Sequence, residues 1–354
     1  MKKLDYIIVG QGIAGSLLAY KLLKADKKII VLNDESLPTS SQVAGGIFNP
    51  ITGKNLDKTW LADKIFPYLK DFYLSLEKEF NTTFYHETNL YRPFANEEQQ
   101  KHFMRLTDEY DLGNYIKIIS ANNTEYSAIT NTLGGLHTSF AGWVNVPKMI
   151  ENFGKHFRSR EVYRAEKFVY EALEVSENEV IYKDIEAKRI IFCEGYYASQ
   201  NPFFNWIPFN PAKGETLLAD VEGYNITEII NQGSWIIPLG GGKCRIGSTY
   251  VWDKLDWETT ESGRALISSK IDKFLLRSYN ITNQEAGIRP TTKDRRPFVG
   301  NHPLHNNVYV FNGLGTKGVS LAPFFAEEML CFLEKNKVLM SESNIKRFYS
   351  LYSL

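Results

Sequence analysis

The sequence predicts an α/β fold (α+β over the whole chain), and three patterns lead to this prediction. The first is a short apolar run, Tyr6–Val9, followed at once by a glycine-rich turn, a helical pattern and a second apolar run. The second is a pair of strand-like stretches within 233–252, separated by three glycines. The third is another glycine-rich turn, 313–318, which precedes a helical pattern. Strands that alternate with helices favour parallel pairing at the start of the chain.

Length and composition limit the class of protein. A chain of 354 residues suits two domains with a sizeable core, and its net charge of +0 offers no overall basic field for nucleic acid. Cys193, Cys244 and Cys331 lie far apart without metal-ligand spacing, which fits a reducing compartment. The charged start resembles a secretory signal, but Asp5 and Gln11 interrupt that pattern. We therefore expect a cytoplasmic protein with no metal site and no membrane partner; the oligomeric state stays open.

The N-terminal elements predict a dinucleotide-binding turn. Gly10, Gly12 and Gly15 form a GxGxxG pattern between a strand and the helical pattern 16–24, and this context raises the pattern above chance. Gly10 allows the tight turn, Gly12 lets a pyrophosphate approach the backbone, and Gly15 lets the helix lie close to the strand. The helix N-terminus favours the phosphates. The expected cofactor contacts here are Gly10, Gly12, Ile13, Ala14 and Gly15.

The end of the second strand, 28–32, departs from the usual dinucleotide-binding pattern. An acidic residue commonly stands there and binds the ribose hydroxyls. In this chain the place falls on Asn33, with Asp34 and Glu35 directly after it. Asparagine can still accept from and donate to a diol. The sequence leaves open which of the three makes the contact.

Several later segments carry recognisable patterns. In chain order they are SSQVAGGIFNP (40–50), FAGWVNVPKMIENF (140–153), EVYRAEKFVYE (161–171), RIIFCEGYYA (189–198), PAKGETLLA (211–219), GIRPTTKDRRPFVG (287–300) and VYVFNGLGTKGVSLAPFFAEEM (308–329). In this order they resemble the D-amino-acid oxidase superfamily of FAD-dependent oxidoreductases, from about residue 5 to 333. Within it the chain looks similar to the glycine and sarcosine oxidases, and nearest to the oxidase module of the bifunctional tRNA wobble-uridine biosynthesis enzyme.

The resemblance implies two interleaved domains. A Rossmann-type FAD-binding domain would take 1–80, 140–212 and 283–354. A substrate domain on a mainly antiparallel sheet would take 81–139 and 213–282. The hairpin pattern around the glycines at 240–242 fits the second domain, and the helical pattern 261–279 would pack on its sheet.

The resemblance also implies noncovalent FAD. Sarcosine-oxidase relatives attach the flavin through a cysteine near the place of Gly287, and the cysteines of this chain lie elsewhere. Backbone N–H groups in the turn 313–318, with a helix after it, suit the flavin carbonyl that gains negative charge on reduction, and Lys317 would add to that effect. The further FAD contacts expected are Asn33, Asp34, Ser41, Gly45, Gly46, Phe168, Gly195, Gly313, Gly315, Thr316, Lys317 and Gly318.

The implied reaction is oxidation of the C–N bond of an amino acid or N-substituted glycine. Hydride passes to the flavin, and the imine hydrolyses to a 2-oxo acid and an amine. Arg289, held extended before Pro290, would bind the substrate carboxylate through its planar fork of donors. Trp235 falls where glycine oxidase has a tyrosine that touches the carboxylate, and Asn49 lies in a segment expected to line the pocket.

Arg245 carries two interpretations. It falls where sarcosine oxidases have a lysine that helps reduced flavin react with oxygen, so it would act as a fixed positive charge. Alternatively, because strand residues alternate between faces, it would point outward and pair with an acid such as Asp253. The sequence does not decide between them.

Two other functions stay open. The first is oxidation of carboxymethylaminomethyl-uridine in tRNA without the methyltransferase half, which the zero net charge disfavours because tRNA contact normally needs a basic face. The second is a flavin-binding protein without catalysis. A small-molecule amine or amino acid is the favoured partner, and the exact substrate and electron acceptor stay open.

Overall fold

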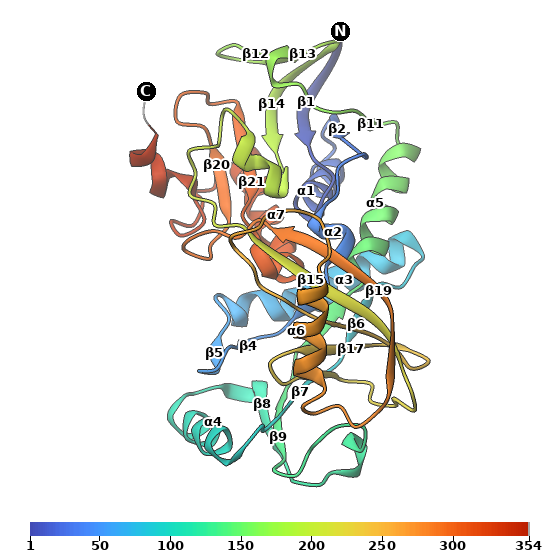
Figure 1. The fold of residues 1–354 in the computed structure, drawn as a ribbon. Helices are drawn as coiled ribbons and strands as arrows, with labels where there is room; N and C mark the ends of the chain where they lie inside the picture. Colours follow the sequence, from blue (N-terminus) through green and yellow to red (C-terminus); the bar gives the residue numbers. More distant parts are fainter. Residues whose placement is uncertain (353–354) are drawn as a thin grey trace. The chain divides into compact units, whose positions relative to one another are not determined.

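The computed structural model describes residues 1–352 and divides into two compact units. Unit 1 contains Met1–Ala44, Val146–Ala212 and Gly287–Leu354, and unit 2 contains Gly45–Asn145 and Lys213–Ala286. Figure 1 shows the ribbon and its helices and strands. The sequence-based division placed residues 45–80 in the first domain, whereas the contacts group them with unit 2. The predicted mixed α/β class is confirmed.

Unit 1 is built on an eight-stranded sheet. Strands β11, β2, β1, β14 and β21 run parallel in that order. Strand β13 is antiparallel to β14, β12 is antiparallel to β13, and β20 is antiparallel to β21. The strands are β1 (Lys2–Val9), β2 (Ile29–Asn33), β11 (Tyr163–Ala165), β12 (Leu173–Val175), β13 (Val180–Tyr182), β14 (Ile185–Phe192), β20 (Phe298–Asn301) and β21 (Val308–Asn312). Ile7 and Ile190 are paired and fully buried, as expected for central parallel strands covered on both faces.

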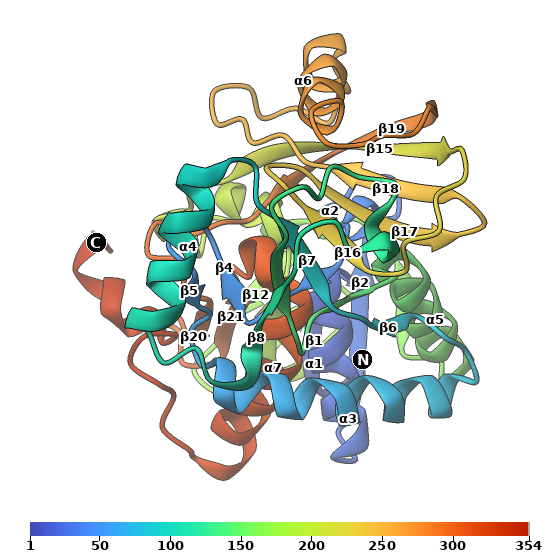
Figure 2. The same cartoon turned by 90° about the horizontal axis from the view of Figure 1, so that it is seen from below.

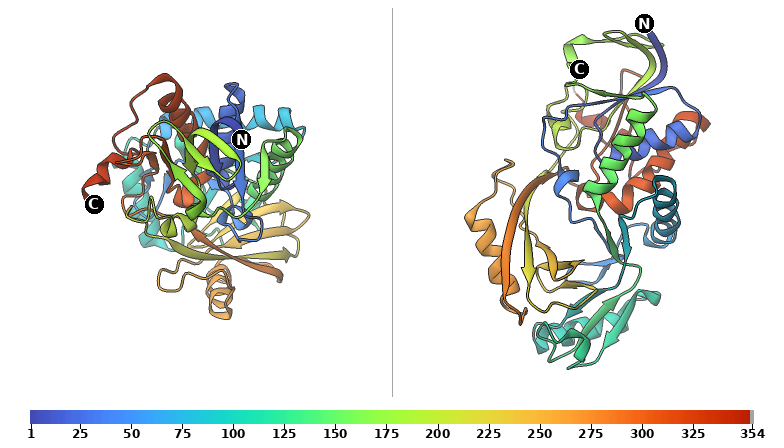
Figure 3. Two further views of the ribbon diagram at one scale, coloured as in Figure 1. Left: turned by 90° about the horizontal axis from the view of Figure 1, so that it is seen from above. Right: turned by 90° about the vertical axis from the view of Figure 1, so that its right-hand side faces the viewer.

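Helices cover this sheet, and the helix after the first glycine turn lies beside the helix after the last. The α-helices are α1 (Ile13–Lys24), α2 (Ser40–Val43), α5 (Val146–Ser159) and α7 (Gly318–Lys335). Short 3₁₀ helices are η3 (Tyr170–Ala172), η4 (Gly195–Gln200), η5 (Gly315–Lys317) and η6 (Ile345–Leu351). Helix α1 packs against α7 and also contacts α5 (Figure 3, right, in blue, red and green).

Unit 2 centres on a second eight-stranded sheet, in the order β19-β15-β18-β17-β16-β7-β9-β8. The strands are β7 (Leu90–Pro93), β8 (Ile116–Ile119), β9 (Gly135–Thr138), β15 (Ala212–Val221), β16 (Ile229–Asn231), β17 (Trp235–Gly240), β18 (Lys243–Gly247) and β19 (Tyr279–Arg289). The predicted hairpin is confirmed as β17–β18. Helix α6 (Glu261–Ile271) packs on one face of this sheet, where Ile267 and Ile271 join Leu217 and Ile236 in one core (Figure 2).

The helix predicted over 261–279 is shorter in the structure. Helix α6 ends at Ile271, and Tyr279 already begins β19. Between them the chain makes backbone hydrogen bonds with a distant segment: Leu276 N–H donates to Ala128 O at 2.8 Å. These tertiary bonds and the burial of Phe274 override the local helical pattern.

The remaining elements of unit 2 form smaller layers. Strands β3 (Ile47–Phe48), β10 (Gly142–Val144) and β6 (Tyr85–Glu87) make an antiparallel sheet, and β4 (Ile51–Thr52) pairs with β5 (Asp57–Lys58). The helices are α3 (Ala62–Phe80), α4 (Glu97–Glu109) and the 3₁₀ helices η1 (Gly113–Tyr115) and η2 (Thr124–Tyr126). Helix α3 is amphipathic and buries Ile65, Leu69 and Leu76.

Helix α1 approaches the first glycine turn most closely at Gly15. A substitution there therefore tests the packing of this helix against the turn. A Cβ at Gly15 would lie 1.9 Å from the Gly10 carbonyl oxygen. We expect Gly15→Ala to lower the free energy of unfolding by about 1–3 kcal/mol, because backbone must shift to admit the methyl group. Urea titration followed by far-ultraviolet circular dichroism measures this.

The matched control is Gly154→Ala in α5, where the added Cβ would meet the flexible end of Arg158 at 2.9 Å. That variant should change the stability by less than about 1 kcal/mol, since alanine is also the better helix former. Equal stability losses in the two variants would contradict the steric explanation.

Candidate functional site

The first glycine turn of unit 1 has the geometry of a dinucleotide cradle. Gly10 has φ +98°, and a Cβ there would lie 2.6 Å from the Cys193 carbonyl oxygen. At Gly12 the only atom within 4 Å of an added Cβ, apart from its chain neighbours, is Ser41 Oγ at 3.3 Å. Packing within the protein therefore excludes a side chain at position 10. At position 12 the packing is looser and gives only a weak reason for glycine. Close approach of a phosphate to the backbone is the stronger reason for Gly12, so these residues fit FAD.

The start of α1 brings two predicted cofactor contacts together. The Ile13 N–H donates to Ser41 Oγ at 3.2 Å, and the first turn of α1 holds no acidic residue. Ser41 lies on α2, whose start is closed by a capping box between Thr39 and Gln42. The helix end keeps its positive field, which favours an anion.

Among Asn33, Asp34 and Glu35, the residue that contacts the glycine turn is Asn33. Its Oδ1 accepts the Gln11 N–H at 2.9 Å, and its Nδ2 donates to Tyr163 OH at 3.3 Å. The amide therefore fixes the turn without adding a negative charge beside it. Asn33 lies where the sequence placed the ribose contact, at the end of β2.

The two acids after Asn33 have partners of their own. Asp34 accepts from the Ser36 hydroxyl at 2.6 Å, which lowers the pKa of the Asp34 carboxyl. Glu35 is ion-paired with Arg158 and accepts from Tyr163 OH at 2.8 Å. Of the three candidates, Asn33 alone forms a hydrogen bond with the glycine turn within residues 1–352.

The second glycine turn lies against the segment that follows Arg289. Gly313 has φ +72°, and a Cβ there would come within 2.6 Å of Thr292 Cγ2. Gly315 has φ +55°, and its N–H donates to Pro290 O at 3.3 Å. Positive φ favours glycine at both places.

The two glycine turns meet at the starts of α1 and α7. A Cβ at Gly318, the first residue of α7, would lie 3.3 Å from Ile13 Cγ2. Thr316 is exposed and Lys317 is half-buried in the turn before the helix. Two helix N-termini therefore lie side by side, which is the arrangement expected for binding negatively charged groups.

Arg289 is placed beside these turns. It is the last residue of β19, is half-buried, and its carbonyl accepts the Thr291 N–H at 2.8 Å. The preceding residue is tied to α2, because Ser40 Oγ donates to Ile288 O at 2.7 Å. A Cβ at Gly287 would lie 2.4 Å from Val43 Cγ2, so α2 lies close against this strand end. The predicted extended backbone at Arg289 is confirmed.

Gly195 and Phe168 have different surroundings. Gly195 has φ +56° and its carbonyl accepts from Asn312 Nδ2 at 3.0 Å, so it lies beside the second glycine turn. Phe168 is buried in the core of unit 1 and its ring stacks on Tyr182, with centroids 4.4 Å apart. Any contact of Phe168 with a cofactor would therefore involve its backbone.

Glu194 is a polar residue of this region that the sequence reasoning missed. Its carboxylate accepts from Tyr170 OH at 2.6 Å and from Asn201 Nδ2 at 2.7 Å. A Cβ at Gly10 would lie 3.4 Å from Glu194 Cα, so Glu194 lies directly against the first glycine turn. Burial raises the pKa of Glu194 to about 7. The available signal was an acid directly after the apolar run RIIFC.

The predicted residues of unit 2 gather around one tryptophan. The Trp235 indole lies between two glycines: a Cβ at Gly45 would be 2.8 Å from Cη2, and one at Gly247 2.6 Å from Cζ2. Gly46 has φ +70°, and its added Cβ would meet Val144 O at 2.0 Å. These glycines are required by packing within unit 2 itself.

Asn49 has a local role. Its Oδ1 accepts the Ile51 N–H at 3.1 Å, and its carbonyl accepts from Thr59 Oγ1 at 3.0 Å. The side chain therefore holds the turn into β4. Its predicted place in a substrate pocket stays a prediction.

Arg245 forms an ion pair within its own sheet. On β18 it lies opposite Leu218 and Ile237, and its Nη1 lies 2.9 Å from Glu285 Oε2. The sequence named Asp253 as a possible partner; the acid paired with it here is Glu285. Because Glu285 offsets the positive charge of Arg245, this arginine is less suited to stabilise the negative charge that develops when reduced flavin reacts with oxygen.

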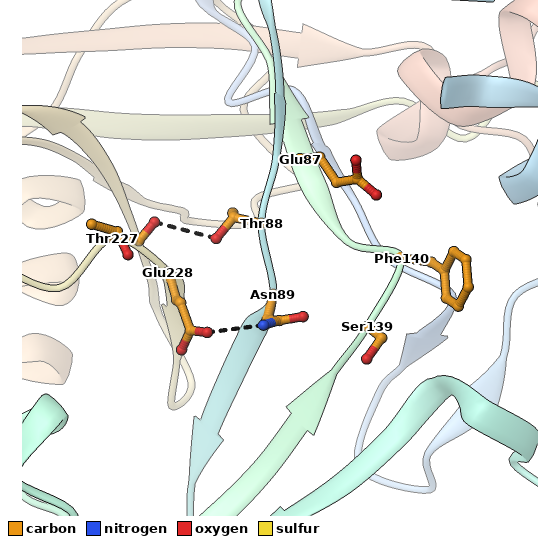
Figure 4. A pocket seen from close by; sticks show the side chains of 7 residues that line it. All are labelled: Glu87, Thr88, Asn89, Ser139, Phe140, Thr227 and Glu228. Atoms are coloured by element: carbon orange, nitrogen blue, oxygen red, sulfur yellow. Dashed lines mark hydrogen bonds between the residues drawn. The ribbon is translucent and has the colours of Figure 1, made fainter. Parts of the chain in front are cut away.

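Unit 2 contains a cavity of about 450 Å³ whose lining includes none of the predicted site residues (Figure 4). Its lining residues are Glu87, Thr88, Asn89, Ser139, Phe140, Thr227 and Glu228. Glu228 accepts from Asn89 at 3.0 Å and from Tyr126 at 2.5 Å, and lies 2.7 Å from His137 Nε2. These bonds join β7, β9 and the start of β16, so they serve the sheet.

Within residues 1–352, no group of three or more His, Cys, Asp or Glu side chains could hold a metal ion. Nor does that part of the chain contain a helix long and apolar enough to cross a membrane. Its three cysteines are present as free thiols.

Glu194 gives the site a testable pH dependence. Its pKa is about 7 in the folded protein and 4.5 is its ordinary value, so the folded state retains a proton that the unfolded chain releases between these pH values. Stability from this group therefore falls as the pH rises from about 4.5 to 7. At pH 8, Glu194→Gln should raise the free energy of unfolding by roughly 1–3 kcal/mol, and the gain should vanish near pH 4.5.

The control is Glu171→Gln, which changes an exposed acid of η3 in the same way. Urea midpoints at several pH values compare the variants. A gain for Glu194→Gln that does not depend on pH would contradict the titration of Glu194.

Known proteins resemble this chain over most of its length. The family model described as FAD dependent oxidoreductase, named DAO, matches residues 5–330. A tRNA 5-methylaminomethyl-2-thiouridine biosynthesis bifunctional protein, MnmC, from Idiomarina loihiensis is 20% identical over 97% of this chain and 58% of its own length. Glycine oxidase from Bacillus licheniformis is 23% identical over 95% of both chains.

Solved structures agree on the fold. Iminodiacetate oxidase from a Chelativorans species has a TM-score of 0.80 at 16% identity and covers 97% of this chain and 98% of its own. The chain spans only 58% and 54% of the length of two MnmC relatives. Together with the match over residues 5–330, these results confirm the resemblance found in the sequence. This chain belongs to the DAO family of FAD-dependent oxidoreductases, so it is an enzyme whose cofactor is FAD.

Proposed function

We propose that the enzyme oxidises the C–N bond of an amino acid or an N-substituted glycine. The observation that carries this proposal is the place of Arg289, half-buried at the end of β19 and followed by Pro290, whose carbonyl accepts from the second glycine turn. Relatives named glycine oxidase and iminodiacetate oxidase act on substrates of this class. A guanidinium beside the turns that suit FAD is the group needed to orient a substrate carboxylate.

Each group of residues has a defined task in this proposal. Arg289 binds the carboxylate through two parallel N–H donors and so fixes the α-carbon. The N-termini of α1 and α7 supply a positive field for the cofactor, and Gly12 lets a phosphate approach the backbone. Bound FAD supplies the acceptor for the two electrons and the hydrogen that leave the substrate carbon. Unit 1 therefore supplies both the groups that serve the cofactor and the arginine for the substrate carboxylate.

A second candidate is the same oxidation on a carboxymethylaminomethyl group of tRNA. The match to MnmC proteins supports it, although those relatives are much longer than this chain. The net charge of +0 does not favour a tRNA partner. Anaerobic bleaching of the flavin by free amino acids and N-substituted glycines supports the first candidate, and bleaching by modified tRNA alone supports the second.

The first test asks whether FAD is bound without a covalent bond. Cys193 is buried, and burial raises its thiol pKa, so its reactive thiolate form is disfavoured. We expect purified protein to be yellow and acid precipitation to release intact FAD into the supernatant. Chromatography of the supernatant identifies it; flavin that stays with the precipitate would contradict noncovalent binding.

Arg289→Lys is the test of the carboxylate contact. Lysine keeps the charge but loses the planar fork, so kcat/KM should fall by an amount equivalent to roughly 2–4 kcal/mol, mainly through KM. The visible spectrum of bound FAD should persist. Stopped-flow reduction under anaerobic conditions measures the effect.

The control is Arg295→Lys, an exposed arginine in the loop after Arg289. Its kcat/KM should stay close to the parent value. If Arg289→Lys behaves like this control, Arg289 does not bind the substrate.

A further inference from the structure

Glu194 belongs to a segment of unit 1 that contacts both glycine turns. On one side, a Cβ at Gly10 would lie 3.4 Å from Glu194 Cα. On the other side, the Gly195 carbonyl accepts from Asn312 Nδ2 at 3.0 Å, and Asn312 Oδ1 accepts the Gly313 N–H at 2.7 Å. The acid is therefore fixed in the segment that joins the two turns that suit FAD.

The hydrogen-bond partners of the Glu194 carboxylate are neutral. The residue is half-buried, and its carboxylate accepts from Tyr170 OH at 2.6 Å and from Asn201 Nδ2 at 2.7 Å. Within residues 1–352 this carboxylate forms no ion pair. A phenol hydroxyl can donate to a carboxylate and can also accept from a carboxylic acid. The surroundings can therefore hold Glu194 in either protonation state.

The titratable side chains around Glu194 do not offset its charge. They are Tyr170 and the exposed Glu171 of η3, Cys193 after β14, and Tyr196 and Tyr197 of η4. The pKa values of Tyr170 and Cys193 are raised by burial, so both side chains stay neutral where Glu194 titrates. The positive field at this edge of the sheet comes from the N-terminus of α1, which also favours the cofactor's phosphates. An ionised Glu194 and a bound pyrophosphate therefore depend on the same source of stabilisation.

FAD adds negative charge to this edge of the sheet when it binds. Its pyrophosphate stays ionised throughout the neutral pH range, because the phosphate protons are strongly acidic. Like charges repel more strongly in a site partly closed to water than in solution. The repulsion disappears when Glu194 carries a proton, so the protonated protein has the higher affinity for the cofactor.

We propose that Glu194 couples FAD binding to proton uptake, so that the enzyme holds its cofactor more tightly when this carboxyl is protonated. The proton balance is simple. Protein with an ionised Glu194 takes up FAD and one proton, and the complex contains the carboxylic acid. Glu194 thus sets the cofactor affinity through its charge, and the inference does not depend on which amine the enzyme oxidises.

The pH range of the coupling follows from the surroundings of Glu194. Burial raises the pKa of this carboxyl to about 7 in the protein without FAD. The negative charge of bound FAD raises the pKa further. Below about pH 7 the carboxyl is protonated with and without FAD, and the affinity is at its highest. As the pH rises above this value, binding requires proton uptake and the affinity falls.

Dissociation of FAD from the holoenzyme tests this coupling. Ultrafiltration at several pH values, with FAD in the filtrate measured by its absorbance, gives Kd. For the parent protein, Kd should rise at least fivefold from about pH 6 to about pH 8.5. Glu194→Gln keeps the shape of the protonated acid and cannot ionise. Its Kd should match the parent value at about pH 6 and stay within about twofold of it at about pH 8.5.

Tyr170→Phe provides a second variant, which decides the question if Glu194→Gln does not fold. It removes a donor that stabilises the ionised carboxylate, so the pKa of Glu194 rises and the loss of affinity should begin at a higher pH. The control is Glu171→Gln, the same chemical change at an exposed acid of η3, which should keep the parent pH profile. A parent Kd that does not change with pH, or a Glu194→Gln protein with the parent pH profile, would overturn the coupling.

Discussion

The parallel pairing of β1 with β14 is the contact on which the rest of unit 1 depends. Val9 lies opposite Phe192, and the Cys193 N–H donates to Val9 O at 2.8 Å, so two strands far apart in sequence end at one edge. The space there is so small that Gly10 admits no side chain beside Cys193. The glycine turn, Glu194 and the end of β21 all gather at this edge. Ligands of open parallel sheets bind at such carboxyl ends.

Much of this arrangement could be predicted because it is local. The predicted strands 6–9 and 28–32 and helix 16–24 correspond to β1, β2 and α1 with shifts of a few residues. Glycine spacing and apolar runs are enough to predict them, since each feature depends on neighbours in sequence. The β17–β18 hairpin was predictable for the same reason.

Features that depend on distant segments could not be predicted. The end of α6 follows from backbone bonds to Ala128, and no local signal marks them. The partner of Arg245 depends on β15 and β19 lying side by side, and the register of strands so far apart cannot be read from one sequence. Tertiary contacts likewise decide that the Phe168 ring packs into the core while Glu194 lies beneath the turn.

The candidate contacts of the two units differ in kind, and this explains why the sequence indicates the family more sharply than the substrate. In unit 1 the candidate contacts are backbone groups and helix N-termini, where glycine spacing is the main requirement. Such a pattern is recognisable at 20% identity because few side chains are needed. In unit 2 the candidate residues Trp235 and Asn49 are individual side chains held by their neighbours: the Trp235 ring lies between Gly45 and Gly247, and Asn49 accepts from the Ile51 N–H. Changing one such side chain can alter which ligand fits a site without altering the fold, so substrate choice has to be argued from individual residues and their partners.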